Sequence, residues 1–220
     1  MDIHKDNWDA LKQKHYSELT TYDAAFIHLS QVPFFELKGC RIASSLWEMQ
    51  LELNAVSARP KTAGHSPYLL GFALLEQVGR VYQNLSKTAP SQTQQNVSNA
   101  LHYFNDIVAG SNESKALIAF RNILSHRACL AGTTIKGESY IFRFDGTQSD
   151  MIKFPSTPWD GTNEDFLKGR VTWINPTLFK DMIGTTIRNL RQKIINDPAN
   201  LKIRIDANEI KQSHLYILPS

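Results

Sequence analysis

The 220-residue sequence contains only two cysteines, Cys40 and Cys129, which lie far apart in the chain. Two cysteines cannot form the dense disulfide framework of small secreted domains. No Cys-x-x-Cys or His-x-x-x-His spacing indicates a zinc site. We therefore expect two buried free thiols in a reducing compartment, and neither a bound metal nor another cofactor.

Long apolar runs are also missing. No stretch approaches the ~18 to 20 apolar residues that a membrane-spanning helix needs, and the polar residues 1–6 lack the apolar core of a secretory signal. These absences predict a cytoplasmic protein that makes no contact with a membrane.

A large excess of charge of one sign is missing too. The chain has 24 basic and 21 acidic residues, so its net charge is +3. This balance excludes a dedicated nucleic-acid packaging protein, and any contact with RNA must come from a local basic patch. With 42% hydrophobic residues, the chain can bury a core without disulfides or a metal.

Apolar residues recur at helical spacing over most of the chain. After about 15 loosely ordered residues, the pattern predicts a short helix at residues 22–30. Longer helices are expected at residues 36–58, 68–85, 94–109, 115–130 and 176–196. Gly132 is the expected C-terminal stop of the fourth long helix. Amphipathic helices joined by short polar loops are typical of an up-and-down bundle.

The periodicity changes from helical to alternating after this bundle. Tyr140, Phe142 and Phe144 alternate with other residues, and Asp145-Gly146 is a turn signal. We expect a hairpin with residues 151–154 as the partner strand. Residues 171–174 are a third candidate strand, and residues 201–205 a short fourth one.

These patterns predict a mainly α protein, an antiparallel helical bundle with a small β insertion and an additional C-terminal helix. The bundle is expected in residues 1–135 and the insertion in residues 136–175. Residues 176–220 are expected to form the last helix and a tail that packs on the bundle.

Residues 121–126, with the sequence RNILSH, gather polar groups on one side of a predicted helix. Asn122 and His126 are four residues apart and share a face, and Arg121 lies close to that face. The opposite side is apolar and is expected to anchor the helix in the core. It consists of Leu117, Phe120, Ile123 and Leu124.

Cleavage of RNA by its own 2′-hydroxyl needs a base, an acid and a cation that stabilises the charged phosphorus intermediate. Histidine exchanges protons readily near neutral pH, so His126 suits proton transfer. Arg121 offers a forked cation for phosphate oxygens, and Asn122 can hydrogen-bond to the histidine or to the scissile phosphate. Because one histidine does not easily perform both proton transfers, we expect a two-fold homodimer that brings two copies together.

The segment Arg121-Asn122-x3-His126 resembles the Arg-x4-6-His motif of the HEPN superfamily, in which Asn, Asp or His commonly follows the arginine. This resemblance implies a helical bundle and a metal-independent endoribonuclease whose site forms across a homodimer. It also implies a role in toxin–antitoxin or antiviral defence systems, with an antitoxin or defence partner. Arg121, Asn122 and His126 would be the catalytic residues.

Two other interpretations remain open at this point. One is a catalytically silent HEPN-like module that binds a nucleotide or holds a protein partner through its dimer surface. The other is an unrelated bundle with a chance motif, in which His126 would face the core.

Three weaker features accompany the motif. Ser125 and Arg127 are candidates for substrate binding, because they adjoin His126 on the same helix. Glu76 is expected to pair with Arg80 one helical turn later; the alternative is a buried charge near the motif. Aromatic and basic residues of the insertion either bind single-stranded RNA or pack the sheet onto the bundle. They are Phe142, Phe144, Trp159, Trp173, Lys136, Arg143, Lys153, Lys168 and Arg170.

Overall fold

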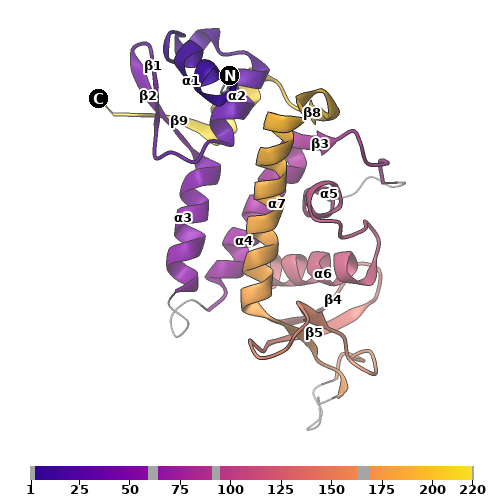
Figure 1. Cartoon of the computed structure of the whole chain (residues 1–220). Coiled ribbons are helices and arrows are strands. Elements are labelled where there is room, and N and C mark those ends of the chain that lie inside the picture. The colour runs from indigo at the N-terminus through magenta and orange to yellow at the C-terminus, as the bar shows by residue number, and fades with distance from the viewer. Residues whose placement is uncertain (1–2, 59–63, 91–94, 163–168, 220) are drawn as a thin grey trace.

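The computed structural model describes residues 3–58, 64–90, 95–162 and 169–219. Within these ranges the chain forms eight α-helices and three β-sheets. The prediction of a mainly α helical bundle is therefore wrong, and the protein is a mixed α/β protein. Sheets lie at both ends of a central group of helices (Figure 1). Local periodicity missed most of this because two of the three sheets join strands that are far apart in sequence.

Five helices form the middle of the molecule. α4 is central, since it contacts each of the other four. α4 begins with a proline in its first turn, and α7 begins where the Asn175 side chain accepts hydrogen bonds from two backbone N–H groups. The five are α3 (Ser45–Ser57), α4 (Ser66–Val81), α5 (Asn96–Phe104), α6 (Asn112–Arg127) and α7 (Pro176–Asn196).

The predicted helix at residues 36–58 is wrong over its first part. β1 (Phe35–Leu37) and β2 (Cys40–Ser44) form an antiparallel hairpin there, and only α3 is helical. Gly39 lies in the two-residue turn with φ +90, which a helix does not allow. The expected stop of this helix at residues 59–60 lies outside the described residues.

The prediction that the first residues are loosely ordered is wrong, because they form α1 (Ile3–Lys12). The Trp8 ring contacts the rings of Phe26 and Phe35, with centroids 5.9 and 4.7 Å apart. The 3-10 helix η1 (Tyr16–Glu18) leads to α2 (Thr21–His28), the helix predicted at residues 22–30. Aromatic contacts therefore order a segment whose own sequence is polar.

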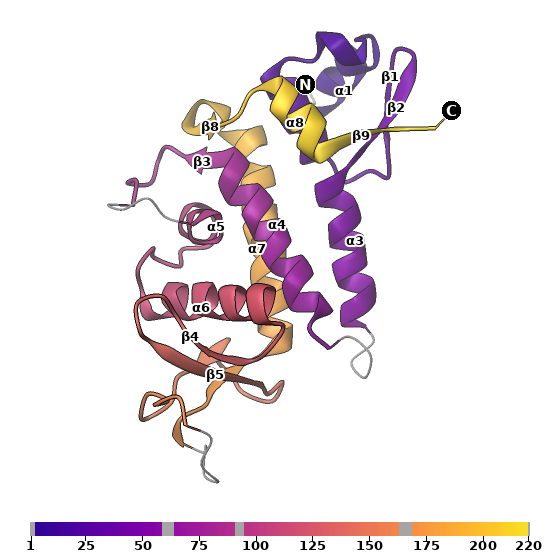
Figure 2. The same ribbon diagram turned by 180° about the vertical axis from the view of Figure 1, so that it is seen from behind.

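The C-terminal segment completes two sheets (Figure 2). After η3 (Pro198–Asn200), β8 (Leu201–Ile203) confirms the predicted short strand and pairs with β3 (Tyr82–Asn84). α8 (Ala207–His214) packs against α2. β9 (Leu215–Leu218), which was not predicted, pairs with β2.

The sheet at the other end of the molecule has four strands in the order β4-β5-β7-β6. They are β4 (Ala131–Thr133), β5 (Ser139–Phe144), β6 (Ile152–Lys153) and β7 (Thr172–Ile174). The expected hairpin between residues 140–144 and 151–154 is wrong, because β7 runs parallel to β5 and separates it from β6.

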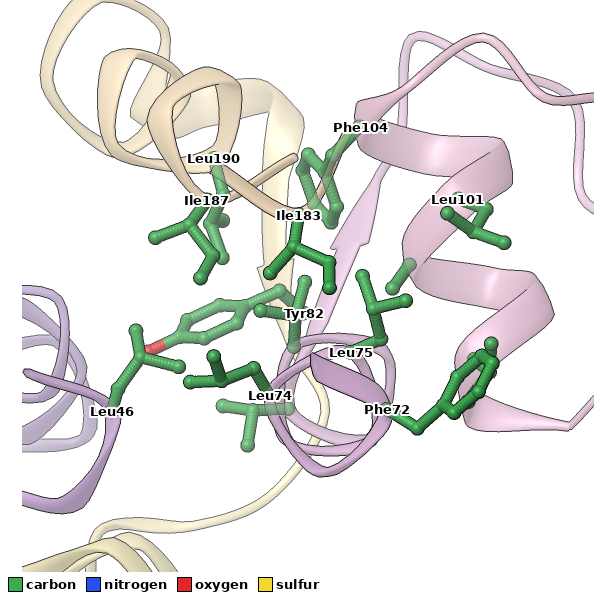
Figure 3. Close-up of a cluster of buried hydrophobic side chains, with 14 of the residues drawn as sticks. Leu46, Phe72, Leu74, Leu75, Tyr82, Leu101, Phe104, Ile183, Ile187 and Leu190 are labelled. Carbon is green, nitrogen blue, oxygen red and sulfur yellow. The ribbon is translucent and has the colours of Figure 1, made fainter. Parts of the chain in front are cut away.

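The main core joins the central helices. Leu74 and Leu75 of α4 lie among Ile183, Ile187 and Leu190 of α7, and all five side chains are fully or almost fully buried (Figure 3). No helix within the described ranges combines the length and hydropathy of a segment that crosses a bilayer. Both cysteines are free thiols, as predicted, but each is half-buried and not buried.

Two glycines let α4 approach its neighbours closely. A β-carbon on Gly71 would collide with the side chains of Ile183 and Phe179 on α7, and one on Gly79 with the backbone carbonyl oxygen of Asn96 on α5. A flexible side chain can shift, whereas a helix backbone moves only as a unit. Gly79 therefore fixes how α5 lies on α4.

We predict that Gly79→Ala lowers the free energy of unfolding by about 1–3 kcal/mol, because the added methyl overpacks the α4–α5 contact. Gly184→Ala is the matched control, since nothing lies within 4 Å of a β-carbon at this helical glycine. It should stabilise by up to about 1 kcal/mol, as alanine favours helix. Urea unfolding of both variants measures the difference, and equal effects would contradict the close approach.

A buried polar cluster lies where α2, α4 and α8 meet. His28 is fully buried, its Nδ1 lies 2.9 Å from the Tyr82 hydroxyl, and its ring stacks on His214 with centroids 4.9 Å apart. Burial, followed by the nearby His214 and Arg191, lowers the pKa of His28 to about 3, although a hydrogen bond with Gln77 opposes the shift. The native state therefore keeps this imidazole neutral.

Stability should consequently fall as the pH falls. Between about pH 6.5 and 3, His28 binds a proton in the unfolded chain but not in the native state. We expect it to reduce the free energy of unfolding by about 2 kcal/mol between pH 7 and 5. Urea unfolding of wild type and His28→Gln at both pH values tests this, and parallel pH profiles would contradict it.

Candidate functional site

α6 carries the motif, and local capping defines its ends. The Ser111 hydroxyl accepts a hydrogen bond from the Ser114 backbone N–H at the start of the helix. The helix ends at Ala128, which adopts a left-handed conformation with φ 48. The prediction that Gly132 ends this helix is wrong, because Gly132 lies in β4.

The apolar side of α6 is buried, as predicted. Leu117 and Phe120 have no exposed surface, and Ile123 and Leu124 are 4% and 2% exposed. These side chains fix the rotation of the helix about its axis. In Figure 2, α6 runs across the direction of α4, with β4 and β5 along its other side.

The motif residues lie on the outer side of α6. His126 is exposed, as are Ser125 and Arg127, while Arg121 and Asn122 are half-buried. His126 forms no hydrogen bond or ion pair with any residue that the structure describes, so its imidazole is free to meet another molecule. An unrelated bundle with a chance motif was expected to place His126 in the core. The structure places His126 on the surface instead.

Arg121 is held by an ion pair across two helices. Its Nη2 lies 3.0 Å from Oε1 of Glu76 on α4, and the two side chains are 27% and 28% exposed. Nη1 of Arg121 also donates a hydrogen bond of 3.0 Å to Oδ1 of Asn122. The side-chain oxygen of Asn122 thus accepts a hydrogen bond from Arg121, whereas we expected Asn122 to bond to His126 or to the scissile phosphate.

The predicted Glu76–Arg80 pair is wrong. Arg80 instead pairs with Glu209 of α8 at 2.5 Å. The alternative interpretation placed Glu76 near the motif as a buried charge. Glu76 does lie near the motif, but its side chain is 28% exposed. The Asn96 side chain of α5 donates a hydrogen bond of 3.2 Å to its Oε2. The spacing of Glu76 and Arg80 predicted a pair within one helix. In the structure each side chain pairs with a residue of a neighbouring helix instead.

The three motif residues are therefore not one hydrogen-bonded group. Arg121 and Asn122 belong to a chain of contacts that runs through Glu76 to Asn96. His126 stands apart from it at the C-terminal end of α6, where Arg127 lies against Gly132 of β4. Sequence reasoning missed Asn96, since no local pattern links residues of α4, α5 and α6.

The aromatic residues of the insertion support packing over RNA binding. Phe142 is fully buried and Trp159 is 8% exposed, so these rings hold the sheet together and against α6. Lys168, one of the basic candidates, lies outside the described residues. In the part of the chain that is described, no three His, Cys, Asp or Glu side chains converge as metal ligands would.

Comparison with known proteins identifies no relative of this chain: no family model, no curated protein and no solved structure matches it. The site must therefore be judged on its own geometry.

We predict that Glu76 and Arg121 are energetically coupled. In a double-mutant cycle of Glu76→Gln and Arg121→Met, the coupling free energy should be about 0.5–1.5 kcal/mol, because the pair is shielded on about three-quarters of its surface. Glu52→Gln, an exposed carboxylate on α3, should change stability by less than about 0.5 kcal/mol. Urea unfolding measures all variants, and additivity of the first two would show that the ion pair contributes nothing.

Proposed function

We propose that this protein is a metal-independent endoribonuclease of HEPN type that acts as a homodimer through His126 and Arg121. The observation that carries the proposal is the placement of the motif. The imidazole of His126 is exposed and unbonded at the end of α6, while an ion pair holds Arg121 on the same helix. The resemblance of residues 121–126 to the HEPN motif supports the same conclusion.

In the proposed reaction the 2′-oxygen of one nucleotide attacks the adjacent phosphorus. His126 of one protomer removes the 2′-hydroxyl proton, and the partner subunit's His126 gives a proton to the departing 5′-oxygen. The bond between phosphorus and the 5′-oxygen breaks, which leaves a cyclic phosphate and a 5′-hydroxyl. The mechanism uses no metal, because the two histidines transfer the protons and Arg121 stabilises the charge on the phosphate.

Arg121 would stabilise the charge that develops on the phosphate oxygens. A guanidinium has five N–H groups, and Glu76 and Asn122 occupy only part of this set. The remaining N–H groups keep a fixed direction, so little reorganisation is needed when phosphate arrives. Ser125 and Arg127, both exposed beside His126, would contact the flanking backbone of the RNA.

A second function is favoured by the same ion pair. The Glu76 carboxylate already offsets the charge of Arg121, which weakens the grip on a phosphate. On this alternative the chain is a catalytically silent HEPN-like module that binds a nucleotide or a protein partner. A defence or toxin–antitoxin role in the cytoplasm, with an antitoxin or defence partner, is compatible with both candidates, and activity decides between them.

We expect His126→Ala to slow RNA cleavage by ~10² to 10⁴-fold through the loss of proton transfer. Arg121→Ala should slow it by about 10² to 10³-fold. Wild-type cleavage should persist in EDTA, since the mechanism uses no metal. The measurement is cleavage of single-stranded RNA, followed on gels.

Stability separates these effects from misfolding. The exposed His126 should cost less than about 1 kcal/mol when truncated, whereas Leu124→Ala should cost about 2–5 kcal/mol, because its side chain is buried. If His126→Ala unfolds the protein but leaves cleavage per folded molecule unchanged, His126 is structural. Absence of cleavage by wild type favours the silent module, and activity that depends on added magnesium overturns the proposed chemistry.

The dimer is the second testable part of the proposal. Light scattering at tens of micromolar should show a dimer, whose interface is expected to bury on the order of 1,200 Å² or more. Ser125→Trp should weaken it by keeping the two α6 helices apart. Ser213→Trp, another exposed serine on a helix, is the matched control. A wild-type monomer would remove the second histidine from the mechanism.

A further inference from the structure

A hollow of about 510 Å³ opens between the end of α3, the start of α4 and the start of α7. These helix ends lie together at the end of the molecule that carries the four-stranded sheet (Figure 1). The inner walls are apolar and include Leu53, Phe144 and Phe179. This volume is in the range of pockets that hold small organic molecules. The hollow is distinct from the motif, since no residue of α6 lines it.

Two hydroxyl groups line the hollow without partners. Tyr68 lines the hollow and is 4% exposed, and its hydroxyl makes no hydrogen bond with any described residue. The ring cannot turn away, because it stacks on Phe144 with centroids 4.4 Å apart. Oγ of Ser57, on the same hollow, is buried and also lacks a hydrogen-bond partner among the described residues. A buried polar group is normally paired, so the unpaired Oγ of Ser57 indicates a ligand with a polar tip, to which the Tyr68 hydroxyl on the same hollow can also bond.

Two opposite charges lie nearer the solvent. Lys180 is half-buried and Asp181 is exposed, and both line the hollow. Neither forms an ion pair with another described residue. The ligand that uses both therefore carries one positive and one negative group, close together.

We propose that this hollow binds a free aromatic α-amino acid with a polar ring substituent, such as tyrosine. The ring lies between Leu53 and Phe179, and its hydroxyl meets Tyr68 and Ser57. The carboxylate pairs with Lys180 and the ammonium group with Asp181. A nucleoside offers no cation to Asp181, and a purely apolar molecule would leave both hydroxyls and both charges unpaired.

Calorimetric titration of the full chain with three probes tests this site. L-Tyrosine should bind about tenfold more tightly than L-phenylalanine, which lacks the polar tip and so one hydrogen bond. N-acetyl-L-tyrosinamide, which has the same ring without either charge, should bind at least tenfold more weakly than L-tyrosine. No heat with millimolar L-tyrosine, or equal affinity for the charged and the capped probes, overturns the proposal.

Three variants locate the binding. Tyr68→Phe keeps the stacked ring and should reduce the preference for L-tyrosine over L-phenylalanine. Lys180→Met should weaken both amino acids by about tenfold or more, while Lys202→Met, an exposed lysine on β8, should change neither. Thermal unfolding confirms that each variant is folded. If Tyr68→Phe lowers stability, Lys180→Met still decides, and unchanged binding in this variant means that the amino acid binds elsewhere.

Discussion

The close approach of α4 and α5 at Gly79 is the contact on which the candidate site depends. Because Gly79 has no side chain, the backbone of Asn96 lies directly against α4. From there the Asn96 amide reaches Glu76, and Glu76 in turn holds Arg121 on α6. The position of a cation on one helix is thus set by the packing of two others. Such support from neighbouring elements is what keeps a charged group in a fixed direction before a ligand arrives.

The sequence predicted the helices that carry their own signals. α7 has an N-cap at Asn175 and one long amphipathic stripe, and α4 begins at a proline in its first turn. It failed at residues 36–44, where short apolar spacing fitted a helix as well as a strand. β2 pairs with β1 across the turn at Gly39 and with β9 on its other edge, and no local pattern in residues 40–44 contains the pairing with β9. The parallel pairing of β5 with β7 was missed for the same reason.

The candidate site divides in the same way. The rotation of α6 followed from its buried stripe, so the exposure of His126 could be predicted from periodicity. The partner of Arg121 could not, because an acid and an amide from two other helices supply it. One signal was present: Glu76 is the only acid of α4, and such a carboxylate needs a partner. Which cation supplies that partner is decided by tertiary packing.

The pairing of β2 with β9 also has a consequence for synthesis. Residues 41–44 leave the ribosome long before residues 215–218, with which they pair. In the same way, α2 is synthesised long before α8, against which it packs. During this interval one edge of β2 has unpaired N–H and C=O groups that other nascent chains can bind. Chains that stall before β9 therefore combine an open strand edge with a finished helical core. Chaperone dependence during translation should accordingly be concentrated in the N-terminal hairpin, far along the chain from the residues that relieve it.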